Sequence, residues 1–108
     1  MASLLLIRIN CPDEVTATEI AEVAIAGRIA ACANIQGPIR SIYSWQGKVE
    51  HEEEWLLWLK VKEIDWDRAE ALVLSKHPFD TPAILGIPCN QVNQRYIDWV
   101  VEETKGQI

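Results

Sequence analysis

Two residues of this chain have the side-chain chemistry of a transition-metal site. His77 stands directly before a proline, and Cys11 stands before another proline at the start of an expected helix. Copper and zinc accept imidazole and thiolate ligands, and a helix N-terminus lowers the pKa of a thiol beside it. No motif of closely spaced ligands surrounds either residue, so His77 would need Cys11 or a carboxylate of a neighbouring subunit as a partner. The alternatives are a His77 side chain bonded to the end of its helix and a Cys11 side chain packed in the core.

The other two thiols have less prospect of binding a metal. Cys32 follows an alanine-rich segment and is expected to pack as a small hydrophobic residue, while Cys89 has no evident partner. Three cysteines at wide spacing do not form a disulfide framework. They fit reduced thiols in a reducing compartment, so we expect a cytoplasmic protein.

A run of four glutamates and one histidine occupies positions 50–54. On a strand, Glu50, Glu52 and Glu54 point to one face, where their carboxylates would attract a hard divalent cation weakly. Solvated charges that prevent aggregation of strand edges are the alternative. Lys60 lies in an apolar strand. It is expected to pair with a carboxylate across a subunit boundary or to reach solvent, and not to act as a nucleophile.

Several functional classes require residues that this sequence does not contain. A net charge of −6 argues against binding of nucleic acid. No run approaches the roughly 18 apolar residues of a membrane span. The chain also has no glycine-rich phosphate loop, nucleophile elbow or zinc-site spacing. We therefore expect a soluble protein that is not an enzyme and that binds neither nucleic acid nor membranes.

The 108 residues suit a single domain, residues 1–108, in which strands and helices alternate. Apolar runs predict strands, and apolar residues at helical spacing predict helices. The expected strands are 4–10, 33–45, 48–62 and 81–88, and the expected helices are 14–31, 66–76 and 93–103, with Asp13 and Asp65 as N-caps of the first two. A hairpin turn is expected at Gln46-Gly47 and a strand irregularity at the earlier Gly-Pro pair. Right-handed crossovers then give an α+β, ferredoxin-like fold, a β-α-β-β-α-β antiparallel sheet with two helices on one face and a C-terminal helix.

The long hairpin carries aromatic side chains that so small a domain cannot cover. Trp55 and Trp58 point to opposite faces of their strand, so one of them lies on the face without the two helices. Tyr43 and Trp45 lie on the other strand of the hairpin. Contiguous apolar surface commonly marks an interface, in which Trp and Tyr serve as anchors. We expect copies of the chain to cover this face, and the C-terminal helix is the alternative cover.

Four segments of the sequence form a pattern in a fixed order: Ala30–Ile35 (AACANI), Ser41–Glu50 (SIYSWQGKVE), His77–Pro82 (HPFDTP) and Tyr96–Trp99 (YIDW). Their order and spacing resemble those of the CutA family of divalent-cation tolerance proteins. The resemblance implies a ferredoxin-like fold and a compact homotrimer, in which long hairpins add to neighbouring sheets. It also implies binding of divalent cations, copper in particular, with no established reaction. The interface residues expected on these grounds are Tyr43, Trp45, Trp55, Trp58 and Lys60.

Two positions depart from the family pattern. The family usually has Tyr after His-Pro and Glu after the second Pro, where this chain has Phe79 and Ala83. A cleft at this place would offer fewer polar groups to a metal or to a phosphate-rich ligand. The expected function is that of a trimeric protein that binds copper or another divalent cation. A PII-like small-molecule sensor and a stable trimeric scaffold for a partner protein are the alternatives.

Overall fold

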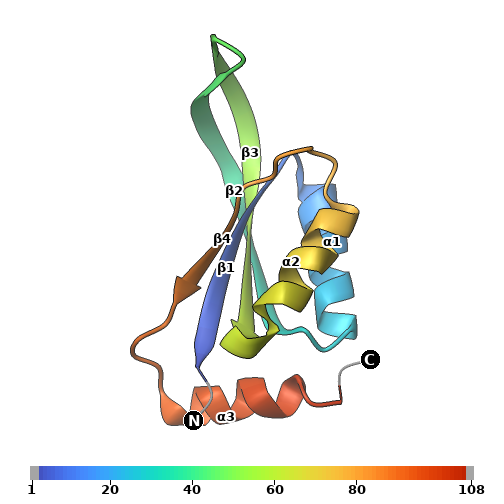
Figure 1. The fold of residues 1–108 in the computed structure, drawn as a ribbon, viewed down its shortest axis with the longest axis vertical. Coiled ribbons are helices and arrows are strands. Elements are labelled where there is room, and N and C mark those ends of the chain that lie inside the picture. Colours follow the sequence, from blue (N-terminus) through green and yellow to red (C-terminus); the bar gives the residue numbers. More distant parts are fainter. Residues whose placement is uncertain (1–2, 107–108) are drawn as a thin grey trace.

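The computed structural model describes residues 3–106, which form four strands and three α-helices (Figure 1). The strands are β1 (Leu4–Cys11), β2 (Ala30–Trp45), β3 (Lys48–Lys62) and β4 (Ile84–Pro88), and the helices are α1 (Glu14–Ala26), α2 (Trp66–Lys76) and α3 (Gln94–Glu103). A short 3-10 turn, Glu63–Asp65, joins β3 to α2. The expected β-α-β-β-α-β order with a terminal helix is confirmed.

The four strands form one antiparallel sheet in the order β2-β3-β1-β4. Helices α1 and α2 lie side by side over one face of it (Figure 1). Because strand side chains alternate between faces, Ile7 and Ile9 of β1 share the helix-covered face with Leu57 and Leu59 of β3. All four side chains are fully buried and form the core with Ile20 of α1 and other apolar residues. The α+β architecture is the one that the sequence predicts.

Helix α1 begins as expected but ends earlier. The Asp13 carboxylate accepts a hydrogen bond of 2.8 Å from the Thr16 N–H, as an N-cap does. At the other end, the Gly27 N–H donates to the Val23 carbonyl, and Arg28 has a positive φ of 57°, which a right-handed helix cannot contain. The prediction of a helix to residue 31 is therefore wrong, and β2 begins at residue 30 instead of 33.

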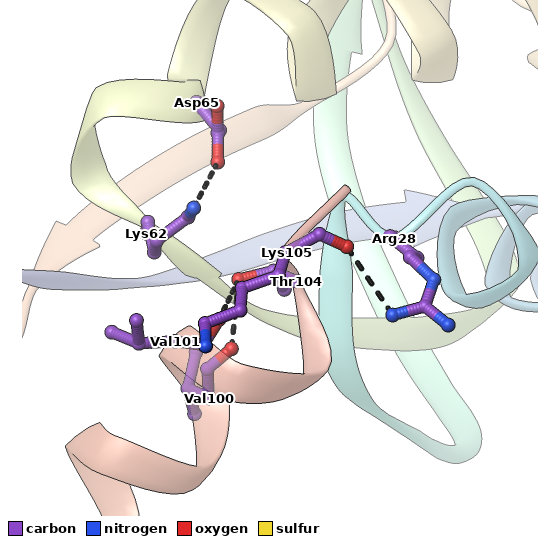
Figure 2. Close-up of polar contacts among 7 residues, drawn as sticks. All are labelled: Arg28, Lys62, Asp65, Val100, Val101, Thr104 and Lys105. Atoms are coloured by element: carbon purple, nitrogen blue, oxygen red, sulfur yellow. Dashed lines mark hydrogen bonds and ion pairs between the residues drawn. The ribbon is translucent and has the colours of Figure 1, made fainter. Parts of the chain in front are cut away.

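A predicted cap and the start of the last strand also differ from expectation. Asp65 makes no side-chain cap bond to α2, and its carboxylate lies 3.7 Å from the Lys62 ammonium (Figure 2). The last strand starts at Ile84 and not at residue 81. Pro82 lies in the missing part, and a proline has no N–H to donate to a strand ladder.

Strands β2 and β3 form a hairpin that projects beyond the rest of the sheet (Figure 1). At its tip, Gln46 and Gly47 have positive φ values of 50° and 79°, so the predicted two-residue turn is confirmed and is of type I′. The predicted irregularity is a register shift between Gln36 and Ile39, where the Gly-Pro peptide bond is cis. We call residues 39–54, which lie beyond this shift, the arm.

Helix α3 crosses the end of the sheet farthest from the tip of the arm (Figure 1). The face of the sheet opposite α1 and α2 is named the open face here. Lys60 points to this face, and its ammonium lies 5.6 Å from the centre of the Tyr96 ring of α3. The helix therefore covers part of the open face, while Leu85 and Ile87 of β4, on the same face, remain exposed.

Hydrogen bonds fix the chain after α3, as Figure 2 shows. The buried Thr104 hydroxyl donates to the Val100 carbonyl over 2.7 Å, and the Arg28 guanidinium donates to the Lys105 carbonyl over 3.2 Å. The first bond closes the end of α3, and the second joins the chain after α3 to the loop after α1. Within residues 3–106, no helix is both long enough and apolar enough to cross a membrane.

Candidate functional site

His77 follows α2 directly, and only 8% of its surface is exposed. Its Nε2 atom lies 2.7 Å from the Asn10 carbonyl oxygen, and the Phe79 N–H donates to Nδ1 over 3.1 Å. Because Nδ1 accepts a hydrogen bond, the ring proton is on Nε2, which donates to Asn10. Both ring nitrogens are thus bonded within the chain. A metal ion could bind His77 only if one of these hydrogen bonds broke.

Cys11 ends β1 on the helix-covered face, and its side chain is fully buried. Burial, followed by the negative charges of Asp13 and Glu54, raises the pKa of the thiol from 9.0 to about 11. The expectation that the start of α1 lowers this pKa is wrong, because the loss of hydration outweighs the helix dipole. Near neutral pH, Cys11 is a thiol, whereas the thiolate is the form that binds metals.

The two predicted metal ligands nevertheless lie at the same end of the sheet. His77 bonds the carbonyl of Asn10, which is the residue directly before Cys11. Within the part of the chain that the structure describes, no group of three His, Cys, Asp or Glu side chains is arranged to hold a metal ion. The role of His77 and Cys11 as metal ligands stays a prediction, and it would require further ligands from another subunit.

A cleft of about 690 Å³ opens beside this end of β1. One wall is the arm, and the other is the segment that joins α2 to β4. Its lining includes Asn10, Tyr43, Trp45, Glu54, Phe79 and Asp80. The Phe79 ring packs against His77 with ring centres 4.9 Å apart. Because His77 bonds the Asn10 carbonyl, the second wall is connected to β1. Phe79 and Ala83, the two departures from the family pattern, both line the cleft.

Glu54 is the buried charge of this cleft. Only 9% of its surface is exposed. Among the described residues, its carboxylate accepts one hydrogen bond, 3.4 Å from the Asn10 amide nitrogen, and is in no ion pair. The other lining residues include no lysine or arginine. Burial of an ionised carboxylate with one long hydrogen bond and no ion pair lowers the stability of the fold unless a cation binds to it.

The glutamates of the arm form the expected row. In the strand register, Tyr43 lies opposite Glu50, and Ser41 lies opposite Glu52, so Glu50, Glu52 and Glu54 share the face of Tyr43. Loss of hydration raises the pKa of Tyr43, and the charges of Glu52, Glu54 and Glu50 raise it further. The row therefore makes this side of the arm electronegative.

The predicted interface residues lie on both sides of the sheet. Trp45 and Tyr43 are exposed on the arm, at 49% and 42% of their surface. Trp58 is the tryptophan of the open face, where its Nε1–H donates to the Gln36 side chain over 3.0 Å and the Arg8 guanidinium lies 5.7 Å from its ring centre. Trp55 points to the other face. Their participation in an interface stays a prediction.

Lys60 contacts its own chain instead of a carboxylate. Its ammonium donates to the Cys32 sulfur over 3.8 Å and lies over the Tyr96 ring. Among residues 3–106 it has no ion pair, so the expected carboxylate would have to come from another subunit. Cys32 is half-buried beside this ammonium, and not sealed in the core as the sequence suggested.

The sequence reasoning missed Asn10 as a site residue. Its carbonyl accepts from His77 and its amide donates to Glu54, so it links both walls of the cleft. A signal for it was present, because Asn10 is a polar residue next to the end of a mostly apolar strand. Asp80, which also lines the cleft, lies within the His77–Pro82 segment of the family pattern, but the sequence analysis assigned no role to its side chain.

Comparisons with known proteins agree with this geometry. The family model of the CutA1 divalent ion tolerance protein matches residues 5–103. The divalent-cation tolerance protein CutA of Pyrococcus horikoshii is 33% identical over 102 residues, which cover 94% of this chain and 99% of that protein. Protein CutA of Mus musculus is 35% identical over 97 residues, 90% of this chain, and the match covers 55% of its length. The crystal structure of the divalent ion tolerance protein CutA1 from Ehrlichia chaffeensis has a TM-score of 0.91 at 30% identity and covers 96% of this chain and 97% of its own.

Proposed function

Because this chain belongs to the family of CutA1 divalent ion tolerance proteins, we propose that it binds divalent cations as a homotrimer and catalyses no reaction. The observation that carries the proposal is the family match over residues 5–103, which includes every strand and helix except the first residue of β1. The family resemblance favours copper as the cation. Zinc is the second cation to test, because it accepts the same imidazole and thiolate ligands. The proposed location is the cytoplasm, where the three free thiols would stay reduced.

Exposed apolar side chains support the proposal of assembly. Ile42 and Val49 of the arm are 62% and 68% exposed, and they lie near the exposed Tyr43 and Trp45. Burial of one such side chain contributes roughly 1.5–3 kcal/mol. Three copies whose arms pack on neighbouring sheets would remove this surface from water. The open face, with its exposed β4 residues, offers a second apolar surface to the same assembly.

The row of glutamates supports the proposal of cation binding. Glu50, Glu52 and Glu54 share one face of the arm, and carboxylate oxygens bind hard divalent cations. Copper also favours nitrogen and sulfur ligands, which His77 and Cys11 would supply after rearrangement. In a trimer, rows from neighbouring arms would add to the number of ligands.

Mass measurement and metal titration test the two halves of the proposal. Light scattering at micromolar concentration is expected to give three times the mass of one chain. Copper or zinc at tens of micromolar is expected to shift the thermal unfolding temperature. The double variant E50Q/E52Q should reduce the shift, whereas the matched control E19Q/E22Q, with both changes on exposed positions of α1, should keep it.

The result of each measurement bears on a different part of the proposal. A folded single chain at that dilution would overturn the assembly. The absence of any shift with copper, zinc or magnesium would overturn cation binding. If His77→Ala removes the shift and E50Q/E52Q does not, the cation binds at the imidazole and not at the glutamate row.

A further inference from the structure

Cys32 and Lys60 form a pair of nucleophilic side chains that the proposed cation binding does not use. They lie directly opposite each other on β2 and β3, and the side chains of such cross-strand partners share one face of the sheet and come close together. The register shifts by one residue between Ala30 and Cys32. This shift turns the Cys32 side chain to the open face, because Ala31 is the extra residue of a bulge. The strand register therefore holds the sulfur next to the ammonium.

The contact lies within one chain, so it does not depend on which surfaces other copies cover. The Lys60 ammonium donates to the Cys32 sulfur over 3.8 Å and lies 5.6 Å from the centre of the Tyr96 ring. Helix α3, which carries this ring, covers this part of the open face. The Cys32 thiol also donates to the Asn34 side-chain oxygen over 3.8 Å. In the assembled protein the pair would stay in place beneath its own helix.

The other two cysteines differ from Cys32 in what surrounds their sulfur atoms. Cys11 is fully buried, and its burial raises the pKa of the thiol to about 11, so little of the reactive thiolate forms. The Cys89 sulfur donates to the Ile87 carbonyl over 3.9 Å, and a carbonyl oxygen does not attack an oxidised sulfur. Reactive cysteines lie in electropositive surroundings. Cys32, with an ammonium group at 3.8 Å, matches that description.

We propose that Cys32 and Lys60 form a reversible sulfur–nitrogen cross-link when the protein is exposed to a peroxide. Hydrogen peroxide first oxidises the thiol to a sulfenic acid: one peroxide oxygen binds to sulfur and the other leaves as water. The Lys60 ammonium gives one proton to solvent, and its amine attacks the sulfur. The S–N bond forms, the S–O bond breaks, and the hydroxyl leaves as water with a second proton from the nitrogen. In total the peroxide accepts two electrons, and sulfur and the neutral amine lose one hydrogen atom each.

The cross-link would change the charge beneath α3. A sulfenic acid condenses with a backbone nitrogen in the same way, and the product nitrogen is not an ammonium, so one positive charge is lost next to Tyr96. One thiol then cleaves the S–N bond and forms a mixed disulfide with Cys32, and a second thiol releases the free cysteine. The inference goes beyond the proposed cation binding and revises the expectation that Lys60 is not a nucleophile. Each of the two proposals can fail while the other holds.

Peptide mapping of the assembled protein tests the inference. The reduced protein is treated with hydrogen peroxide in the presence of a chelator, alkylated with iodoacetamide and digested with trypsin. Trypsin does not cleave after a cross-linked lysine, so the expected product joins residues 29–40 to residues 49–62. Its mass should lie two hydrogen atoms below the sum of the two peptides. Dithiothreitol added after the peroxide and before the alkylation should remove this product.

Lys60→Arg and Lys62→Arg are a matched pair of variants for this test. A guanidinium stays protonated and does not attack sulfur, so Lys60→Arg should abolish the product. Lys62→Arg, on the same face of β3, should leave its yield unchanged. Cys32→Ser should also abolish the product, whereas Cys89→Ser should keep it.

The wild-type map decides the question even if a variant fails to fold. The inference would be overturned if Cys32 stayed a thiol under peroxide. It would also be overturned if Cys32 ended as a sulfinic acid or a disulfide without a lysine link, or if it became linked to a lysine other than Lys60.

Discussion

The indole of Trp55 packs directly on Gly37, at the register shift between β2 and β3. A Cβ atom placed on Gly37 would lie 2.8 Å from Cδ2 of Trp55 and 2.9 Å from its Cε3. Such distances are shorter than carbon atoms tolerate, so the absence of a side chain at position 37 is what lets the indole pack against the strand. The contact marks the boundary between the core of the domain and the arm.

Gly37→Ala is therefore expected to destabilise the fold. The added methyl group would displace a large ring or bend β2, and overpacking of this kind costs about 1–3 kcal/mol. Urea unfolding would measure the loss as a lower midpoint at an unchanged slope.

A Trp55→Ala background provides the control for this prediction. In a Trp55→Ala background the methyl group meets no ring, so Gly37→Ala should cost less than it does in the wild type. Strictly additive effects of the two substitutions would show that the indole is not the obstacle.

The sequence predicts this fold well because its periodic signals are strong. Leu57, Leu59 and Val61 occupy every second position of β3, and the structure buries all three on one face. The two-residue turn at Gln46-Gly47 follows from local backbone preference. The end of α1 does not follow from local preference. The alanine-rich sequence after residue 26 permits a helix, and this segment forms a strand because Ala30 pairs with Val61 of β3.

The site was less predictable because burial depends on tertiary structure. Glu54 ends a run of glutamates that are otherwise at least partly exposed, and nothing local distinguishes it from Glu52. Its burial arises where the arm leaves the sheet beside Asn10. For Cys11, a local argument from the helix dipole gave a lowered pKa, while the complete burial of the side chain raises it.

His77→Ala is expected to lower stability whether or not a metal is present. It would leave the part-buried Asn10 carbonyl and Phe79 N–H without their partner. A fully buried unsatisfied group costs about 1–3 kcal/mol, which sets the upper limit for each of the two. Urea unfolding in the presence of a chelator would measure this loss. An unchanged stability, together with a lost response to copper, would instead identify His77 as a ligand with little structural role.

The raised pKa of Cys11 predicts a loss of stability at high pH. The folded chain holds the thiol proton more tightly than the unfolded chain. The contribution of Cys11 to the free energy of unfolding is therefore complete below pH 9 and is lost as the pH rises toward about 11. The slope from this one group cannot exceed about 1.4 kcal/mol per pH unit. Urea unfolding between pH 8 and 11 should show that the free energy of unfolding declines less with pH in Cys11→Ala than in the wild type.

Cys89→Ala is the matched control for this pH dependence, because that thiol is only half-buried. The free energy of unfolding of Cys89→Ala should decline with pH as that of the wild type does. Alkylation by iodoacetamide at pH 8, followed by mass spectrometry, should modify Cys11 last of the three thiols. Rapid modification of Cys11 in the folded protein would contradict its burial and the raised pKa.

Lys60, Cys32 and Tyr96 form a cluster in which two substitutions should have opposite effects. Loss of hydration raises the pKa of Tyr96, the Cys32 sulfur raises it further, and the Lys60 ammonium lowers it. Lys60→Met keeps the length of the side chain but removes the charge, so it should move the tyrosinate transition to higher pH. Cys32→Ala should move it to lower pH.

The measurement is the ultraviolet absorbance of tyrosinate as a function of pH, in a Tyr43→Phe background that leaves Tyr96 as the sole tyrosine of the chain. Lys62→Met removes a charge from the same strand, close to Asp65 and without a contact to Tyr96 in the described structure, and should shift the transition less. Shifts of the same sign for Lys60→Met and Cys32→Ala would mean that changed hydration governs Tyr96, and that the contact between its ring and the ammonium has little electrostatic effect.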